Sequence, residues 1–465
     1  MTSVARKSAS KTDRAPAPPG PLGTSPVAFL RAFRRDRMRL FLDAQRRFGD
    51  IVRFRVGPKW LYLVLDPEAV QRVLQENHRN YDKRSAGYGK LKLALGDGLL
   101  TSEGEFWRRQ RRIVQPAFHR DRLHQFGAVM TQATLAMLER WREPAQQREP
   151  VDVAAEMMRL TLEIIGTTMF STNLGSDSRR LGELMTTAIE YINERITTWT
   201  AAFDFPEKLP TVKNRRFRQA LRAGNQMVRE VIEARRRSGT DHGDLLSMLM
   251  QMRDEETGEW MTDQQLRDEI ITIFAAGHET TANALAWCWY LLSRNPAVGR
   301  KLREELDRVL GGRVPTADDL PRLTYTAMVV KETMRLYPPA WVISRNAVGD
   351  DVLGGFHIAA GSVVLVSPYV THRHLRFWEN PEGFDPERFV GDRLAALPRY
   401  VYFPFGGGPR MCIGTGFAMM EAQLILATVA QRHELHLLPG ESVEPEPLVT
   451  LRPRHGVMAL VQARS

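Results

Sequence analysis

The longest continuous helical pattern in the chain runs from Asp263 to about Asn295 and reads DQQLRDEIITIFAAGHETTANALAWCWYLLSRN. Thr262 and Gln265 form a capping-box pattern at its start, and Pro296 marks its end. At about 1.5 Å per residue, such a helix is roughly 50 Å long. A helix of that length can cross the whole core, so the sequence predicts a fold built around one long central helix.

Shorter helices and strands flank this pattern. Ile51–Val56 and Trp60–Leu65 are β-rich runs on either side of a Gly57-Pro58 turn, which predicts a hairpin. Most of the following 250 residues or so show helical spacing, and the last third of the chain mixes short strands with loops. We therefore predict a mainly α fold with small β-sheets, of the α+β class.

The N-terminal stretch MTSVARKSASKTDRAPAPPGPLG is basic and Pro-rich, and no Pro/Gly/Ser-rich linker follows it. We therefore expect a disordered tail over residues 1–15 and one large domain over residues 16–465. No window of about 18 residues is continuously apolar, so we expect neither a signal peptide nor a membrane span. The sequence predicts a soluble, unanchored protein.

The chain carries a formal net charge of +11 and two cysteines, Cys288 and Cys412. The charge fits a solvated, arginine-rich surface, which we favour, and it also fits a nucleic-acid partner or an acidic protein partner. So few cysteines in 465 residues favour a reducing compartment, and we expect the cytoplasm. Two cysteines cannot build a four-thiolate zinc or iron–sulfur site.

Cys412 lies in the segment FPFGGGPRMCIG. A phosphatase-type nucleophile would need an arginine six positions later, where Ala418 stands, and covalent haem attachment would need a C-x-x-C-H pattern, which the chain lacks. A buried, inert cysteine does not explain the surrounding glycines and Arg410. These residues fit a sulfur that binds a large, flat metal cofactor, because glycines allow close approach and the following helix presents a positive N-terminus.

The segment resembles the F-x-x-G-x-R-x-C-x-G signature of the cytochrome P-450 haem-thiolate monooxygenases of soluble bacterial type. The fixed positions are filled by Phe405, Gly408, Arg410, Cys412 and Gly414. The resemblance implies the cytochrome P-450 fold, with the long central helix over a haem and the cysteine loop beneath it. It implies that Cys412 is the axial ligand of the iron of haem b, and that Phe405, Gly406 and Gly414 also bind the cofactor.

The motif AAGHETT lies within the long helix. Gly277 weakens the helix there, and the Thr280 hydroxyl can bond back to the carbonyl of Ala276. The resemblance implies that Glu279 and Thr280 are a catalytic acid–alcohol pair that helps to deliver protons to bound dioxygen, and that Ala276 borders the haem. His278 lies on another face of the helix from Ala276, so we expect it to point away from the cofactor.

Several basic residues match family residues that bind the haem propionates. Trp107 and Arg111 lie four apart on one face of the helix FWRRQRRIVQPAF. The resemblance adds Lys83, Arg345 and Arg410 to this set. The neighbouring Arg108, Arg109 and Arg112 lie on other faces, where they form either a solvated surface or a docking patch for an acidic electron donor.

Two further groups of residues follow from the resemblance. Glu332, Arg335 and Arg388 match a buried charged triad that supports the cysteine loop, although the first two alone would also fit a surface ion pair. An apolar substrate pocket is predicted from residues near the haem, and terpenoids, fatty acids, macrolides and steroids all fit it. The pocket residues are Leu100, Ala275, Ala276, Trp341, Val342 and Ile343.

The resemblance implies an enzyme that inserts one atom of dioxygen into a C–H bond or double bond of an apolar small molecule. Electrons would come from a separate ferredoxin or flavodoxin with its reductase. We expect a monomer that binds no nucleic acid and has no membrane span. Two alternatives stay open, namely a peroxygenase of the same fold driven by hydrogen peroxide, and a non-catalytic haem-thiolate sensor or binding protein.

Overall fold

The structure, a computed structural model, describes residues 15–21, 26–170, 175–197 and 209–464. All but the last residue of the predicted tail, residues 1–15, lies outside these ranges. The contacts of the chain divide it into two compact units. The sheet unit comprises Met1–Ser85, Val342–Pro381 and Ala395–Met411, and the helical unit comprises Ala86–Trp341, Glu382–Leu394 and Cys412–Ser465.

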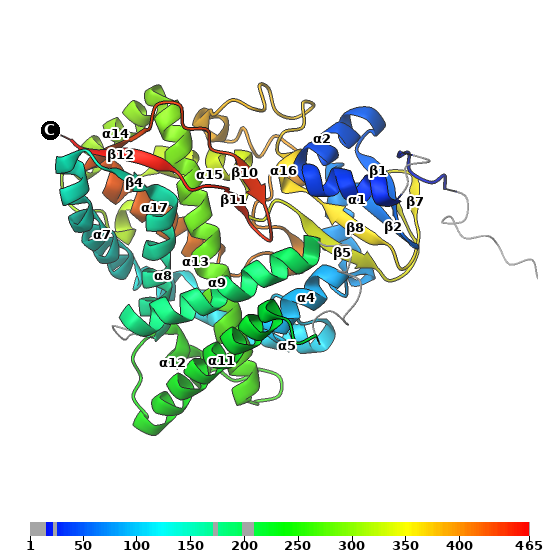
Figure 1. The fold of residues 1–465 in the computed structure, drawn as a ribbon, viewed down its shortest axis with the longest axis horizontal. Helices are drawn as coiled ribbons and strands as arrows, with labels where there is room; N and C mark the ends of the chain where they lie inside the picture. The colour runs from blue at the N-terminus through cyan, green and yellow to red at the C-terminus, as the bar shows by residue number, and fades with distance from the viewer. Residues whose placement is uncertain (1–14, 22–25, 171–174, 198–208, 465) are drawn as a thin grey trace, which may run out of the picture. The chain divides into compact units, whose positions relative to one another are not determined.

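The sheet unit contains short helices and most of the strands (Figure 1). Its elements are α1 (Pro26–Arg35), α2 (Arg37–Phe48), β1 (Ile51–Val56), β2 (Lys59–Val64), α3 (Pro67–Gln71), η2 (Arg72–Glu76), η3 (His78–Asn80), β3 (Tyr81–Asp82), β5 (Ile343–Ala347), β6 (Asp351–Leu353), β7 (Phe356–Ile358), β8 (Val363–Val366), α16 (Pro368–Thr371), η8 (Arg399–Val401) and η9 (Gly408–Arg410). Five strands form one sheet in the order β1-β2-β8-β5-β3, and β6 pairs with β7.

The predicted hairpin is confirmed, because β1 pairs antiparallel with β2 around Gly57, whose φ is +58°. β2 and β8 are parallel, and their apolar residues are buried in one core with Tyr400 and Phe403. Phe403 begins the segment that contains Cys412. Its N–H donates a hydrogen bond to Nε2 of His372 at 2.9 Å, so the start of this segment is anchored in the core.

The helical unit contains the longer helices and two small sheets. Its elements are α4 (Ala86–Leu95), α5 (Gly104–Val114), η4 (Gln115–Phe118), α6 (Arg120–His124), α7 (Gly127–Gln147), β4 (Pro150–Asp152), α8 (Val153–Phe170), α9 (Gly175–Thr197), α11 (Val212–Ser238), α12 (Leu245–Gln251), α13 (Asp263–Arg294), α14 (Pro296–Leu310), η6 (Ala317–Asp319), α15 (Thr324–Leu336), η7 (Pro386–Phe389), α17 (Thr415–Ala430), β9 (His433–Leu437), β10 (Pro445–Pro447), β11 (Leu451–Pro453) and β12 (Met458–Ala463).

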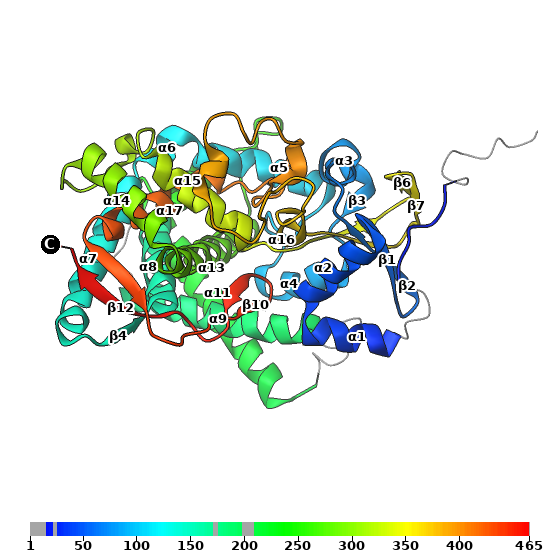
Figure 2. The same cartoon turned by 90° about the horizontal axis from the view of Figure 1, so that it is seen from above.

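The predicted long helix is α13, which has 32 residues and begins with the capping box of Thr262 and Gln265. It packs against α8, α11, α15 and α17. Figure 2 views α13 nearly end-on, with α8 and α11 beside it. Because helices cover it on several sides, α13 is buried along most of its length, as expected of a helix through the centre of a core.

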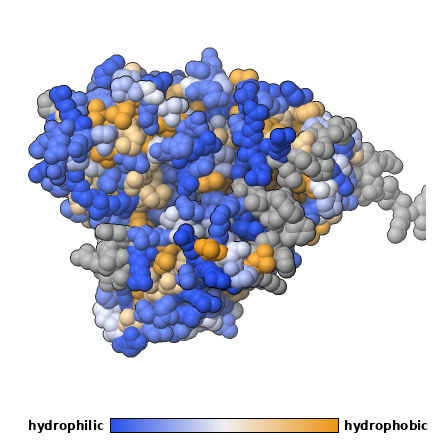
Figure 3. Space-filling view, in the orientation of Figure 1, coloured by the Kyte–Doolittle hydropathy of each residue, from blue (hydrophilic) through white to orange (hydrophobic). Residues whose placement is uncertain are grey.

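The face of the molecule in Figure 3 is mostly hydrophilic, with apolar residues scattered in small groups. Within the described residues, no helix is both long and apolar enough to cross a membrane. The structure has the mainly α architecture with small sheets that the sequence predicts, and the longer helices lie in the helical unit.

A buried carboxylate holds the sheet unit together beside its main sheet. Asp351 is 4% exposed at the start of β6 and accepts hydrogen bonds from Arg72 at 2.7 Å, Tyr81 at 2.8 Å and Asn77 at 3.0 Å. Burial alone would raise the pKa of Asp351, but the bonds from Arg72, Tyr81 and Asn77 outweigh it and hold the pKa below its usual value. The ionised carboxylate is thus the stabilising form.

We expect Asp351→Asn to lower the free energy of unfolding by about 2 kcal/mol at neutral pH, because the amide cannot accept all these bonds and leaves Arg72 without its charge partner. A lowered folded-state pKa stabilises the fold above the unfolded-state pKa, and this stabilisation is lost as the pH falls through the folded-state value. The difference in the free energy of unfolding between the variant and the wild type should therefore become smaller at acidic pH. Chemical denaturation at several pH values measures it.

The matched control is Asp43→Asn, since the Asp43 side chain is 47% exposed and pairs only across one helix turn with Arg39. This change should alter the stability by less than about 0.5 kcal/mol. Equal effects of Asp351→Asn and Asp43→Asn would contradict the role assigned to Asp351.

Candidate active site

The cysteine segment leads from η9 into α17. Cys412 lies three residues before Thr415, the first residue of α17, and the Gly414 N–H forms a hydrogen bond with the Cys412 thiol. The N-terminus of a helix favours negative charge, so it partly offsets the desolvation that raises the pKa of the Cys412 thiol. The local sequence therefore places the sulfur where it can act as an anionic ligand.

Two of the three glycines before the cysteine are required by packing within the sheet unit. A Cβ on Gly408 would lie 2.0 Å from the carbonyl oxygen of Leu74, and a Cβ on Gly407 would lie 2.3 Å from the ring of Tyr400. Gly408 also has a φ of +63°, which other residues rarely adopt. The sequence interpretation was that these glycines allow the close approach of a ligand. It did not predict that the segment also packs tightly on η2 and Tyr400.

The two cysteines differ in their surroundings. Cys288 is buried, and this burial raises the pKa of its thiol to about 12, so it stays neutral. Cys412 keeps solvent-exposed surface. Desolvation by the surrounding protein raises the pKa of the Cys412 thiol, whereas the Gly414 N–H, the charge of Arg111 and the Thr415 hydroxyl act to lower it. Cys412 is thus the cysteine whose sulfur can reach a ligand.

Helix α5 contributes the predicted Trp107 and Arg111. Trp107 is 7% exposed, and Arg111 is half-buried. Desolvation lowers the pKa of the Arg111 guanidinium, and the charge of Cys412 acts to raise it. The helical unit therefore brings a cation within electrostatic range of the sulfur, where it can also attract an anionic group of a ligand bound there.

The middle of α13 has an open face. Between Leu266 and Leu292, all of which is described, Ala276 is the only exposed residue, and Thr280 one turn later is half-buried. The predicted bond is present, since the Thr280 hydroxyl donates to the Ala276 carbonyl at 2.7 Å. A Cβ on Gly277 would lie 3.0 Å from Cδ1 of Ile165, so this glycine also allows α8 to pack closely.

The predicted acid, Glu279, is 8% exposed. Its Oε1 accepts a hydrogen bond from the Thr450 hydroxyl at 2.6 Å, and the Asn283 amide donates to the Thr450 hydroxyl at 3.1 Å. Thr450 was not predicted, and no local signal could have found it, because 171 positions separate it from Glu279. The acid and the alcohol of the AAGHETT motif are thus next to each other in sequence, and a third residue holds the acid.

His278 is 2% exposed, and its Nδ1 lies 2.8 Å from the carbonyl oxygen of Phe274. Burial lowers the pKa of His278, so the ring stays neutral. Its ring also packs against that of Phe274, with 5.7 Å between centroids. These contacts agree with the sequence interpretation of His278 as a packed side chain on another face of the helix from Ala276.

The structure brings the three residues of the predicted triad together within the helical unit. Glu332 is fully buried, and its carboxylate pairs with Arg335 at 2.6 Å and with Arg388 at 3.3 Å. The N–H of Asp385 donates to Glu332 at 2.9 Å, and Arg335 donates to the carbonyl of Gly383 at 2.8 Å. The triad therefore fixes the loop around residues 383–388 against α15.

The other predicted cofactor-binding residues lie in the sheet unit. Arg345, on β5, is 5% exposed and donates to the carbonyl of Ser344 at 2.9 Å, and among the described residues no carboxylate pairs with it. A buried guanidinium without a counter-ion suits an anionic ligand group. Lys83 is 7% exposed, and Phe405 and Arg410 are half-buried. Gly406 has a φ of +72°.

The predicted pocket residues are divided between the units. Leu100, Ala275 and Trp341 belong to the helical unit, and Val342 and Ile343 to the sheet unit. Trp341 is 2% exposed, and its indole N–H donates to the carbonyl of Leu448 at 2.9 Å. This tryptophan therefore has a clear packing role in addition to the predicted one. Leu100 and the pair Val342 and Ile343 are half-buried.

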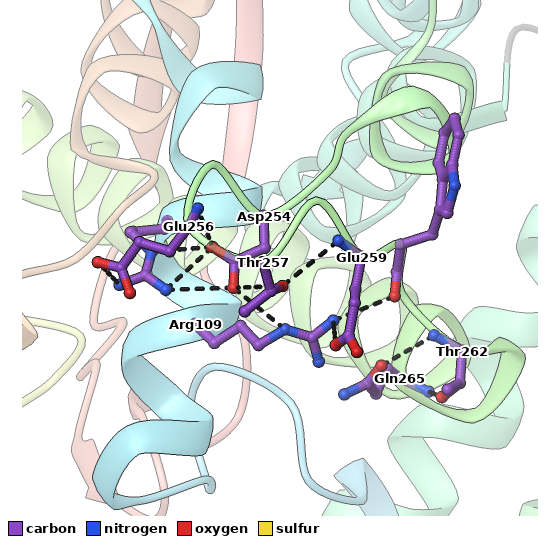
Figure 4. Close-up of polar contacts among 9 residues, drawn as sticks. Arg109, Asp254, Glu256, Thr257, Glu259, Thr262 and Gln265 are labelled. Atoms are coloured by element: carbon purple, nitrogen blue, oxygen red, sulfur yellow. Dashed lines mark hydrogen bonds and ion pairs between the residues drawn. The ribbon is translucent and has the colours of Figure 1, made fainter.

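The basic residues beside Arg111 are paired with acids. Arg109 lies 3.3 Å from Asp254 and 3.0 Å from Glu259, and Arg112 lies 2.9 Å from Asp254 and 2.6 Å from Glu256 (Figure 4). Arg108 pairs with Glu105 one turn earlier. A docking patch made of these arginines would therefore carry less free positive charge than the sequence alone indicates.

Asp254 was not predicted, although it is 1% exposed and joins α5 to the loop before α13. Glu269 was missed in the same way. It is fully buried in α13 and accepts hydrogen bonds from the Leu99 N–H at 3.1 Å and from Gln110 at 3.0 Å, and burial raises its pKa to about 8. Glu269 follows Arg267 and Asp268 directly in the sequence, so no local signal distinguishes it from an exposed acid.

We expect Glu332→Gln to lower the free energy of unfolding by about 3–5 kcal/mol, because it leaves two guanidinium groups without a buried counter-ion. Denaturant unfolding of the purified protein measures the change. Glu304→Gln, at an exposed position of α14, is the matched control and should have little effect. A Glu332→Gln protein as stable as this control would show that the triad does not support the fold.

The donor set at Cys412 restricts the kind of metal that can bind. Within the described residues, no group of three His, Cys, Asp or Glu side chains could hold a metal ion. A single thiolate suits a metal that receives its other ligands from a cofactor, as the iron of a haem does. Arg111, within electrostatic range of the sulfur, can meet a carboxylate of such a cofactor. The residues present therefore fit a haem.

Comparison with known proteins agrees with this chemistry. A family model described as Cytochrome P450 matches residues 18–459. Over 413 residues the chain is 40% identical to Cyclooctatin synthase of Streptomyces melanosporofaciens, and the match covers 88% of each chain.

Two other relatives are similar over nearly their whole length. Cyclooctat-9-en-7-ol 5-monooxygenase of Streptomyces melanosporofaciens is 39% identical, with 87% of this chain and 86% of the relative covered. Pentalenene oxygenase of Streptomyces avermitilis is 34% identical, with 88% and 90% covered. Together with the cysteine segment and the AAGHETT motif, these matches show that the chain belongs to the cytochrome P450 family.

Proposed function

We propose that this P450 monooxygenase hydroxylates or epoxidises a terpenoid, one of the four substrate classes that the sequence leaves open. The observation that carries the monooxygenase function is the cysteine segment together with the acid–alcohol pair on α13. The names of two relatives, which specify cyclooctat-9-en-7-ol and pentalenene as the molecules concerned, support an apolar unsaturated substrate. The exposed face of α13 at Ala276, flanked by the buried Ala275, supports an apolar contact with it.

Cys412 binds the cofactor through its sulfur, and we propose haem b. When bound, the haem supplies an iron at which dioxygen is reduced and activated. The Gly414 N–H stabilises the negative charge of the sulfur, and Phe405 and Gly406 contact the cofactor. Trp107, Arg111, Arg345, Arg410 and Lys83 bind its two carboxylates. The buried position of Arg345 and the effect of Arg111 on Cys412 support this assignment.

Glu279 and Thr280 manage the protons that the reaction consumes. The Thr280 hydroxyl, bonded to the Ala276 carbonyl, lies on the open face of α13 and can hold a water or an oxygen atom of a ligand. Glu279, beside it in the chain, exchanges protons with solvent. This pair supports the dioxygen-dependent reaction over the peroxide-driven alternative, and no observation favours a non-catalytic sensor.

Members of the family receive electrons from redox partners, and for this chain we propose a ferredoxin or flavodoxin with its reductase. Arg108, Arg109 and Arg112 are each paired with an acid, which reduces their free positive charge. The docking surface that we propose therefore includes other basic residues as well. We further propose a monomer in the cytoplasm, with residues 16–465 acting as one haem-binding domain. The substrate contacts would come from Leu100, Ala275, Ala276, Val342 and Ile343.

Cys412→Ser tests the assignment of the thiolate. We expect the variant to lose the red-shifted Soret band of the reduced, CO-treated protein, because the hydroxyl cannot replace a thiolate as ligand. Absorption spectra of wild type and variant measure this band. Cys288→Ala, at the other cysteine, should keep it. A wild-type protein without the band, or a Cys412→Ser protein with it, would refute the assignment.

Thr280→Ala tests proton management. We expect at least about a tenfold loss of product formed per reducing equivalent, with the remaining equivalents released as hydrogen peroxide, because the variant lacks the hydroxyl that positions the proton. Terpenoids that shift the resting iron to high spin provide the substrates for this assay. Efficient turnover with peroxide alone that Thr280→Ala leaves unchanged would instead support the peroxygenase.

A further inference from the structure

We propose that Thr450 is a positioning residue for Glu279, so that a residue of the β10–β11 hairpin takes part in proton delivery. This inference rests on the role proposed above for Glu279. The contacts form a chain with defined direction. The Asn283 amide donates to the Thr450 hydroxyl at 3.1 Å, and that hydroxyl donates its single proton to Oε1 of Glu279 at 2.6 Å.

All three residues of this chain are buried. The exposed fractions are 3% for Asn283, 6% for Thr450 and 8% for Glu279. In such surroundings a hydrogen bond to an ionised group is stronger than a neutral one, and each bond in a chain strengthens the next. Thr450 therefore holds one oxygen of the carboxylate in place. The second oxygen, Oε2, makes no hydrogen bond within the described residues, so it can exchange a proton.

The segment around Thr450 is rigidly held. Its neighbour Leu448 accepts a hydrogen bond from the indole of Trp341 at 2.9 Å, and the N–H of Val449 donates to the Asn193 side chain at 2.7 Å. On the other side, the carbonyl of Leu451 accepts from the indole of Trp287 at 3.1 Å. These bonds come from three separate parts of the helical unit, so the Thr450 hydroxyl has a fixed position relative to α13.

A fixed hydroxyl is what Glu279 needs for its proposed role. Consecutive residues of an α-helix point about 100° apart, so Glu279 cannot share the open face of α13 that Thr280 borders. A glutamate side chain has several staggered rotamers, each of which places the carboxyl differently. The bond to Thr450 selects one of them. The geometry assigns Oε1 to anchoring and leaves Oε2 for proton exchange.

A buried Thr450 hydroxyl could instead serve stability alone, and four variants separate the two roles. Thr450→Val removes the hydroxyl with little change of shape, and Thr450→Ser retains it. Thr134→Val, in α7, is the control, because the buried Thr134 hydroxyl bonds only to the Met130 carbonyl of its own helix. Asn283→Ala removes the amide that orients the hydroxyl, and it provides a second test if Thr450→Val fails to fold.

We expect Thr450→Val to lower kcat and the product formed per reducing equivalent by about fivefold to tenfold, which corresponds to the loss of one typical hydrogen bond. The KM for substrate and the substrate-induced spin shift should stay the same. Thr450→Ser should return both quantities to their wild-type values. Asn283→Ala should give values between those of the wild type and those of Thr450→Val. In crystals of Thr450→Val, the Glu279 carboxyl should leave its wild-type position. An unmoved carboxyl, or a loss matched by Thr134→Val, would overturn the proposal.

A double-mutant cycle with Glu279→Gln completes the test. If Thr450 acts through Glu279, Thr450→Val should cause no further loss of coupling, that is, of product formed per reducing equivalent, in the Glu279→Gln background. A loss of equal size in both backgrounds would show that Thr450 acts independently and would overturn the inference alone. Wild-type coupling in Glu279→Gln itself would instead show that the proposed role of Glu279 is wrong, and the positioning role would fall with it.

Discussion

The burial of α13 is the constraint on which the rest of the helical unit depends. A continuous helix of 32 residues with most side chains buried must be packed on several sides, and α8, α11, α15 and α17 provide much of this packing. One interruption remains, at Ala276, where the face of the helix is exposed. Because the surrounding packing is tight, this interruption has a fixed position and can serve as a site for chemistry.

Buried carboxyl groups join the other elements of this unit to one another. Asp254 joins α5 to the loop before α13, Glu269 joins α13 to α5 and to the loop of Leu100, and Glu332 joins α15 to the loop of Arg388. Each carboxyl pays a desolvation cost that only its specific partners offset, so each specifies one arrangement of the elements. Residues on α5 thereby keep a defined position near Cys412.

Sequence reasoning succeeded where the signal is local. The capping box at Thr262, the Gly57 turn of the hairpin and the bond from Thr280 to Ala276 each involve residues within a few positions of one another. Cys412 was also proposed from the residues around it, and its role as a ligand stays a prediction. In these cases the short-range preferences of the backbone and the tertiary structure agree.

The same reasoning failed where a contact joins distant parts of the chain. Nothing around Thr450 indicates a bond to Glu279, and nothing around Arg112 indicates that Asp254, 142 positions later, neutralises it. The packing of Gly408 on Leu74 was missed for the same reason, since the sequence shows that a glycine is present and not which atom it approaches. Such contacts depend on the completed fold.

The central claim is that the sulfur of Cys412 is the protein ligand of a haem iron. X-ray absorption at the iron edge of the purified, haem-loaded protein tests this most directly, because it identifies the atoms bound to the metal. The account predicts one sulfur ligand in addition to the nitrogens of the porphyrin. A first shell that contains only nitrogen and oxygen atoms would contradict it.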